Sequence, residues 1–176
     1  QVVITNLKMK IIFKQQFSMD DTHTPEKTLE MVSEIITSGL AQLKVQKNQL
    51  LGVGVGTVGP MDREKGILNH PVNFAAPGWH DVHMLEMLQN SIQRPVFIDN
   101  GANAAVLAEM LFGQGKNFSN LVYIHCGVGI RTGTISSKAI IRTVNDAEDA
   151  FGHMVIDVDG EACACGNYGC IESFSS

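Results

Sequence analysis

The stretch GHMVIDVDGEACACGNYGCIE, residues 152–172, gathers one histidine and three cysteines into a short segment. An imidazole and three thiolates form the donor set of a closed, tetrahedral structural zinc site. Glycines at 166 and 169 allow the chain to fold back, so that the last two cysteines can approach the same ion. The segment therefore predicts a zinc site whose ligands are His153, Cys163, Cys165 and Cys170.

The alternative is that these cysteines are simply buried or form a disulfide. A bridge between Cys163 and Cys165 would have strained geometry, and the nearby histidine favours a metal. Thiolate ligands require reduced cysteines, and Cys126 has no obvious disulfide partner. Both points predict a cytoplasmic protein.

Composition restricts the class of protein. The chain has 176 residues, 44% of them hydrophobic and 18% charged, which predicts one large globular domain or two small lobes. Thirteen basic residues against 18 acidic ones give a net charge of −5, which argues against this segment wrapping nucleic acid by itself. No apolar run reaches the length of about 20 residues that spans a membrane, so no membrane contact is expected.

The order of expected elements indicates an α/β fold with a mixed sheet. A helix start is marked by Thr24 as the cap and Pro25 in the first turn. The expected elements are paired strands within 2–18 with a turn at 6–8, a helix from Pro25 to about Leu43, a buried strand at 52–56, a helix at 80–91, a central strand at 96–98, a helix at 102–112, and a strand at 121–125 followed by a glycine turn.

The zinc segment also resembles the signature of the ROK family, which groups bacterial sugar kinases with sugar-responsive repressors and includes animal N-acetylmannosamine kinase. Further segments fit in the same order: GVGVGTVGPMD (52–62), VNFAAPGW (72–79), PVFIDNGANAAVLAE (95–109) and CGVGIRTG (126–133). The resemblance implies an actin-like ATPase (ribonuclease H-like) fold. It places an N-terminal lobe, truncated at its front, at residues 1–115. Residues 116–176 would begin the C-terminal lobe that carries the zinc segment.

ROK kinases carry Asn-Asp-x-Asn, whose Asp removes the proton from the attacking sugar hydroxyl. The matching run here is Asn100-Gly101-Ala102-Asn103, so Gly101 occupies the base position and no catalytic residue is expected. Asp99 lies two positions away, on a part of the strand end that is not expected to replace the base.

The phosphate loop of ROK kinases, Gly-Thr-Gly-x-Gly-x-Gly, is altered as well. Gly127 and Gly129 remain as a degraded phosphate-binding pair, but Val128 lacks the threonine hydroxyl. Arg131 replaces a glycine; it either binds a phosphate or, as we favour, crowds the loop. ATP is therefore not expected as a cofactor.

The sugar contacts are only partly kept. The family's Ala-Gly-Glu-x-Gly-His glutamate falls on Ala150, with Glu148 nearby. The resemblance implies substrate contacts from Gly59, Asn73, Asn100, His153 and Glu172. Alternatively, Asn100 only caps the following helix, Glu172 only favours a helix start, and Trp79 is a packing residue.

These losses favour the regulator branch of the family, with zinc as a structural cofactor. The expected function is the sugar-sensing effector domain of a ROK-type transcriptional regulator in carbohydrate metabolism, without kinase activity. The expected partners are a sugar or sugar phosphate, a second copy in a homodimer or tetramer, and operator DNA through a helix-turn-helix outside this chain. The alternative is an ATP-dependent sugar kinase acting on a hexose or N-acetylhexosamine, such as a glucokinase or N-acetylmannosamine kinase.

Overall fold

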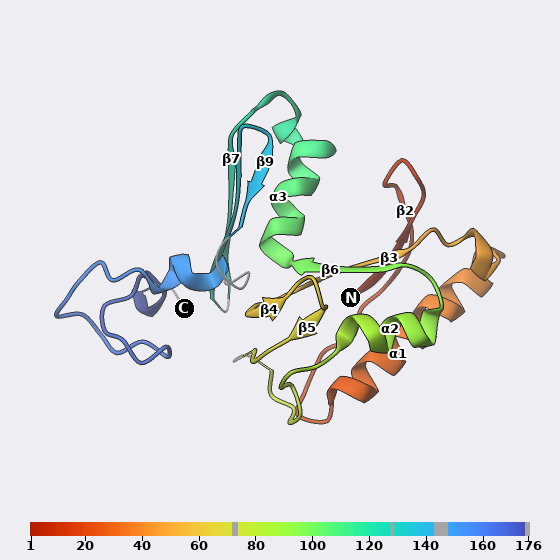
Figure 1. Cartoon of the computed structure of the whole chain (residues 1–176), viewed down its shortest axis with the longest axis horizontal. Coiled ribbons are helices and arrows are strands. Elements are labelled where there is room, and N and C mark those ends of the chain that lie inside the picture. The colour runs from red at the N-terminus through yellow and green to blue at the C-terminus, as the bar shows by residue number, and fades with distance from the viewer. Residues whose placement is uncertain (72–73, 128, 143–147, 175–176) are drawn as a thin grey trace. The chain divides into compact units, whose positions relative to one another are not determined.

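The computed structural model describes residues 1–71, 74–127, 129–142 and 148–174, with the backbone alone at 148–150 (Figure 1). Its elements, with η for a 3-10 helix, are β1 (Val2–Thr5), β2 (Ile11–Gln15), α1 (Pro25–Gln42), η1 (Lys47–Gln49), β3 (Val53–Thr57), β4 (Met61–Asp62), β5 (Ile67–Leu68), α2 (Met84–Ile92), β6 (Val96–Asn100), α3 (Gly101–Leu111), η2 (Gln114–Asn117), β7 (Leu121–Cys126), β8 (Ile130–Ser136), β9 (Ala139–Ile141), η4 (Glu148–His153) and η5 (Ile171–Phe174).

The chain divides into two compact units. The first comprises Gln1–Val55 and Asp62–Ile98, and the second Gly56–Met61 and Asp99–Ser176. Helix α3 precedes the lobe boundary predicted near residue 115, yet it belongs to the second compact unit. The assignment of the family's lobes to 1–115 and 116–176 stays a prediction.

The first unit begins with the predicted hairpin. Strands β1 and β2 pair antiparallel, with Val2 opposite Gln15. The Asn6 side chain accepts hydrogen bonds from the amides of Lys8 (2.9 Å) and Lys10 (3.1 Å), which shapes the turn. The predicted turn at 6–8 is therefore confirmed.

Helix α1 also begins as predicted. Pro25 is its first residue, and the Thr24 hydroxyl accepts from the Lys27 amide at 3.5 Å. One face of α1, which includes Leu29, Ile36 and Leu40, is buried. At Gly39 the helix lies so close to the hairpin that an added Cβ would come within 2.8 Å of Ile4 and Phe13 side-chain carbons.

Helix α2 starts four residues later than the predicted range 80–91. Val82 instead pairs with Leu68 through two backbone hydrogen bonds of 2.9 Å. Asp81 has a left-handed φ of 47°, which is incompatible with a helix at that point. Tertiary pairing thus delays the helix until Met84.

Strand β3 pairs with β6 in a two-stranded sheet of the described residues. Val53 and Val55 are half-buried, and Gly54 is exposed. Phe97 in β6 is 71% exposed. The strands predicted at 52–56 and 96–98 are therefore present as β3 and β6. Two details of the prediction are wrong for the described residues: β3 alternates between half-buried and exposed residues instead of being buried, and the strand at 96–98 is not central, because its sheet has two strands.

The second unit contains an antiparallel sheet ordered β7-β8-β9, with Leu121 opposite Ile135 and Cys126 opposite Ile130. Helix α3 packs against β7 and β8 (Figure 1). The strands β8 and β9 were not predicted, because glycines and the resemblance to a phosphate loop made 126–133 look like a turn. Residues 130–133 in fact begin a strand.

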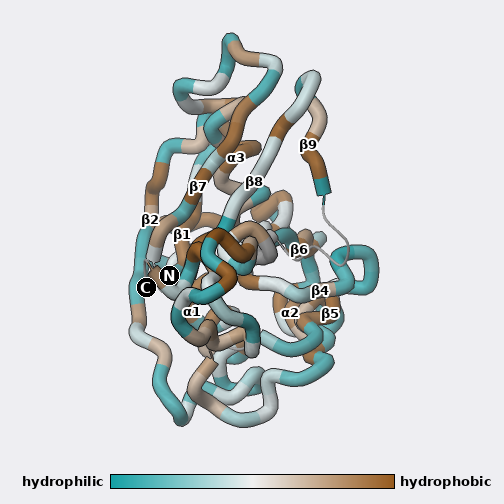
Figure 2. Tube along the Cα trace, turned by 90° about the vertical axis from the view of Figure 1, so that its left-hand side faces the viewer, coloured by the Kyte–Doolittle hydropathy of each residue, from teal (hydrophilic) through white to brown (hydrophobic). Residues whose placement is uncertain are grey.

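Hydrophobic and hydrophilic segments are interspersed along the coloured part of the tube in Figure 2. Among the described residues, no helix combines the length and hydropathy needed to cross a bilayer.

Candidate functional site

The predicted metal ligands converge. His153 ends η4, Cys163 and Cys165 lie in the following turn, and Cys170 precedes η5. Their ligand atoms all lie within 4.8 Å of one another. These four residues could hold one metal ion.

The distances between the ligand atoms fit tetrahedral metal coordination rather than a disulfide. The sulfurs of Cys165 and Cys170 lie 3.7 Å apart, and Cys163 Sγ lies 3.7 Å from His153 Nδ1. Zn–S bonds of about 2.3 Å at tetrahedral angles place two sulfurs about 3.8 Å apart. A disulfide needs a sulfur–sulfur distance of about 2.05 Å, and all four cysteines of the chain, including Cys126 outside the cluster, are free thiols.

Local backbone geometry folds the cysteine segment. Gly166 and Gly169 adopt left-handed φ angles of 93° and 65°, as the sequence predicted for a reversal of the chain. The Cys163 amide donates to the Asn167 carbonyl (2.8 Å), and the Gly166 amide donates to the Cys163 carbonyl (3.0 Å). The ligands are therefore placed by a hydrogen-bonded turn.

The two close thiols have different environments. A hydrogen bond from the Asn167 backbone lowers the pKa of Cys165, whereas burial raises the pKa of Cys170 to about 12. Cys170 is fully buried. A thiolate at this position needs a neighbouring cation, which a bound metal would supply.

Glu172 connects the cysteine segment to strand β8. Its Oε2 accepts a hydrogen bond of 2.7 Å from the Ile130 amide. An added Cβ at Gly129 or Gly152 would lie 2.8 or 2.9 Å from the same oxygen. The predicted sugar-binding glutamate therefore lies against both the glycine turn and the Gly152-His153 segment.

The start of α3 contains the predicted base position. Asn100 is fully buried, and its Oδ1 accepts from the Ala102 amide at 2.9 Å. This residue therefore caps α3, as one of the two sequence interpretations held. Gly101 follows as the first helical residue, and a Cβ there would meet only the Thr57 carbonyl oxygen, at 3.5 Å.

Asp99 is engaged by an arginine that sequence analysis did not single out. Its two carboxylate oxygens accept from Arg142 Nη1 and Nη2, both at 2.8 Å, and the side chains are 26% and 30% exposed. The Asn100 amide also donates to Asp99 at 2.8 Å. The two partners lie 43 positions apart, so no local pattern could reveal the pair.

The predicted phosphate-loop segment, 126–133, includes the last residue of β7 and the first four residues of β8. The Gly127 amide donates to the Gly129 carbonyl at 3.2 Å. Arg131 lies in β8 opposite His125, and its Nε is buried with no hydrogen-bond partner among the residues that the structure describes. Gly133 lies where β8 crosses α3, because a Cβ there would overlap the Ala102 carbonyl oxygen.

Other predicted residues are scattered or not described. Gly59 is buried in the loop between β3 and β4. Asn73 and Val128 lie outside the described residues, as do the side chains of Glu148 and Ala150. Trp79 is buried, donates from Nε1 to the His23 carbonyl at 2.9 Å and contacts the Phe74 ring. This confirms Trp79 as a packing residue.

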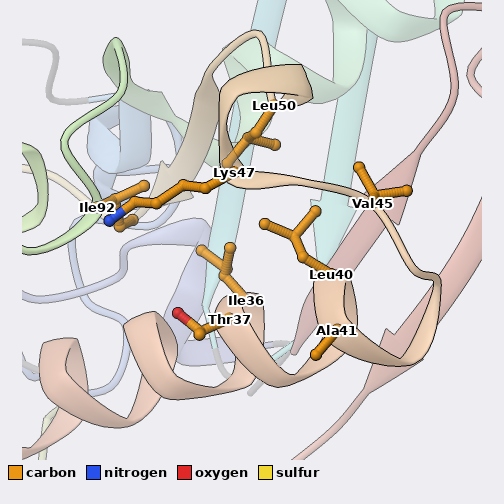
Figure 3. A pocket seen from close by; sticks show the side chains of 8 residues that line it. All are labelled: Ile36, Thr37, Leu40, Ala41, Val45, Lys47, Leu50 and Ile92. Atoms are coloured by element: carbon orange, nitrogen blue, oxygen red, sulfur yellow. The ribbon is translucent and has the colours of Figure 1, made fainter.

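A pocket of about 180 Å³ in the first unit is lined mostly by apolar side chains (Figure 3). Its polar groups are Thr37, whose hydroxyl donates to the Ser33 carbonyl (2.9 Å), and Lys47, whose ammonium lies 3.5 Å from the Ser91 carbonyl. A sugar needs many hydroxyl partners, so this lining does not suit one. The apolar lining residues are Ile36, Leu40, Ala41, Val45, Leu50 and Ile92.

Comparison with known proteins identifies the class. The family model of the ROK family matches residues 1–176, and the chain belongs to this family. The xylose repressor of Bacillus subtilis (strain 168) is 31% identical over 174 residues, covering 99% of this chain and 44% of the repressor. The glucokinase of Thermotoga maritima is 36% identical over 124 residues, covering 70% of this chain and 38% of the enzyme. The chain thus spans less than half the length of these relatives.

Solved structures show the same fold. A ROK family transcriptional regulator, a homologue of the Escherichia coli MLC protein, matches with a TM-score of 0.81 and 22% identity, over 99% of this chain and 43% of that one. A putative N-acetylmannosamine kinase from Listeria monocytogenes matches with a TM-score of 0.70 and 22% identity, over 95% and 53%. The predicted α/β, actin-like ATPase fold of ROK proteins is confirmed.

Proposed function

We propose that this chain is the sugar-sensing effector domain of a ROK-type transcriptional regulator and that it does not transfer phosphate. Similarity to the xylose repressor over 99% of the chain supports the regulator assignment. The protein would act in the cytoplasm, as a homodimer or tetramer. It would bind operator DNA through a helix-turn-helix outside this chain.

The observation that carries the proposal is Gly101 at the start of α3. A kinase needs a carboxylate there to accept the hydroxyl proton, and losing a general base lowers the rate by about 10²–10⁴-fold. The position has room for a side chain, since a Cβ would meet only the Thr57 carbonyl at 3.5 Å. The base is therefore missing because the residue is glycine, and not because the backbone leaves no space for a side chain.

Asp99 is poorly placed to act in its stead. A base must accept a proton from substrate, whereas this carboxylate already accepts two hydrogen bonds from Arg142 and one from the Asn100 amide. The bidentate pair engages both carboxylate oxygens, so a substrate hydroxyl would have to compete with the guanidinium for them. Releasing Asp99 would require breaking this pair.

A structural zinc ion would hold His153 beside the cysteine segment, which leads directly to Glu172. His153 would bind zinc through Nδ1, the ring atom near Cys163 Sγ, and leave Nε2 for a sugar hydroxyl. Asn100, Gly59 and Asn73 would supply further sugar contacts. Ligand binding would then bias the oligomer between DNA-competent and released forms.

Isothermal titration of the full-length protein with D-xylose, D-glucose, N-acetylated hexosamines and their phosphates tests the proposal. At least one should bind, and it should change operator affinity in a gel-shift assay. Glu172→Gln should weaken sugar binding, while Glu161→Gln, at a glutamate of the same 152–172 segment but outside the predicted sugar contacts, should not. Absence of binding to every sugar, together with no operator shift, would remove the proposal.

The second candidate, a sugar kinase, is favoured by the 36% identity to the Thermotoga maritima glucokinase. A coupled ADP-release assay separates the two functions. We expect no turnover by the unmodified full-length protein, and at most a weak gain with Gly101→Asp; Gly101→Ala controls for the added side chain. Sugar-dependent ADP release by the unmodified protein would establish the kinase instead.

A further inference from the structure

Two histidines in the first unit face each other outside every site described above. The Nδ1 atoms of His70 and His80 lie 2.6 Å apart. Their ring centroids are separated by 4.1 Å, with 42° between the ring planes. Both histidines are exposed residues.

The backbone brings these rings together. Leu68 and Val82 exchange two hydrogen bonds of 2.9 Å in an antiparallel bridge, and the Asp81 amide donates to the Asn69 carbonyl at 2.9 Å. His70 lies two residues after Leu68, and His80 two residues before Val82, so the same pairing places them opposite each other. The convergence thus has a backbone cause.

The short contact restricts the tautomers that the two rings can adopt when both are neutral. For two neutral imidazoles, one Nδ1–H must donate to the lone pair of the other Nδ1, so the rings are opposite tautomers. If both ring protons reside on Nε2, both Nδ1 atoms carry a lone pair that can bind a metal. In this second pair of tautomers both Nδ1 atoms can act as metal ligands, and the two rings together carry as many protons as in the first.

We infer that His70 and His80 form a bidentate site for a divalent transition metal that prefers imidazole, such as Ni²⁺ or Zn²⁺. Metal–nitrogen bonds of about 2.0–2.1 Å at angles of roughly 90–110° place two nitrogens roughly 2.8–3.4 Å apart. The observed 2.6 Å reaches this range when the exposed rings separate by a few tenths of an ångström. Water completes the coordination shell.

This site differs in chemistry from the cysteine cluster. The four-residue group around Cys163 is the one group of three or more His, Cys, Asp or Glu ligands found among the described residues, so the histidine pair supplies two protein ligands. Thiolates select zinc and other soft metals, whereas an imidazole pair accepts Ni²⁺. A metal here would tie together the two ends of segment 71–79, independently of whether the protein senses sugar.

The chain contains a single tryptophan, Trp79, the immediate neighbour of His80, and its fluorescence gives a local reporter. Zinc-loaded full-length protein without a histidine tag would be titrated with Ni²⁺ while the emission of Trp79 is followed. Any further tryptophans in the full-length sequence would first be replaced by phenylalanine. Paramagnetic Ni²⁺ at the pair should quench the emission saturably. Thermal unfolding should shift upward at the same Ni²⁺ concentrations, because the metal binds the folded state.

Variants decide the assignment. His70→Gln and His80→Gln should each raise the Ni²⁺ midpoint at least about tenfold and abolish the thermal shift. His83→Gln is the matched control, since this exposed histidine lies nearby in sequence with its Nδ1 3.7 Å from Glu86 Oε2. Unchanged zinc content and metal-free unfolding temperature would verify that the variants are folded. Equal Ni²⁺ midpoints in the wild type, His70→Gln and His80→Gln would overturn the inference.

Discussion

Replacing Gly133 by alanine should loosen the contact between β8 and α3. This glycine matches the last glycine of the kinase phosphate loop, yet the structure places it in a strand against a helix. An added Cβ would overlap the Ala102 carbonyl oxygen, lie 2.7 Å from the carbonyl carbon and lie 3.0 Å from Val106 Cγ1. Carbon atoms normally approach no closer than about 3.5 Å. The strand must therefore shift away from backbone atoms that have little freedom to move.

Overpacking of this kind lowers the free energy of unfolding by about 1–3 kcal/mol. For a chain of this size the loss corresponds to roughly 3–10 °C in Tm. Urea unfolding followed by far-ultraviolet circular dichroism would measure it as a lower midpoint. Gly54→Ala is the control, because a Cβ at this strand glycine would have no heavy atom within 4 Å. That variant should be neutral or more stable by up to about 1 kcal/mol. Equal midpoints for the two variants would refute the packing role of Gly133.

Three further predictions concern charged and metal-binding groups. Removing metal with a chelator should lower Tm, and Cys163→Ser should abolish zinc retention measured by mass spectrometry; Cys126→Ser should retain about one zinc per chain, because this exposed cysteine lies outside the cluster. Arg142→Ala should lower the free energy of unfolding by about 1–3 kcal/mol, because the half-buried Asp99 loses its bidentate partner; a double-mutant cycle with Asp99→Asn would give no coupling if the pair contributes nothing. The Thr22 side chain and backbone and the His23 side chain hydrogen-bond Asp20 and lower its pKa from 3.8 to about 2. Its stabilising effect is therefore present above about pH 4 and lost as pH falls toward 2, so Asp20→Asn should show a smaller loss of stability than wild type over that interval in acid unfolding; identical pH profiles would contradict this assignment.

The sequence was most reliable where the signal is local. Thr24 and Pro25 marked the start of α1: Thr24 is the cap and Pro25 is the first helical residue, as predicted. The Gly166 and Gly169 reversal and the convergence of the four metal ligands were also predicted, since all four ligands lie within one short segment and a glycine turn brings its cysteines together. Local hydrogen bonding and backbone freedom are properties that a short stretch of sequence carries within itself.

Other features escaped prediction because they depend on distant parts of the chain. Strand β8 was taken for part of a phosphate loop, and its pairing with β7 overrides the turn-like glycines. Likewise, Leu68 bridges Val82 and delays α2.

By itself, then, the sequence determined the α/β class, the metal-ligand turn and the absence of a carboxylate at Gly101. Only the tertiary structure decided that Arg142 engages Asp99 and that His70 meets His80. These partners are ten residues apart for the histidines and 43 for Arg142 and Asp99. They come within hydrogen-bond distance only through strand pairing and packing, which depend on the whole fold rather than on any local pattern.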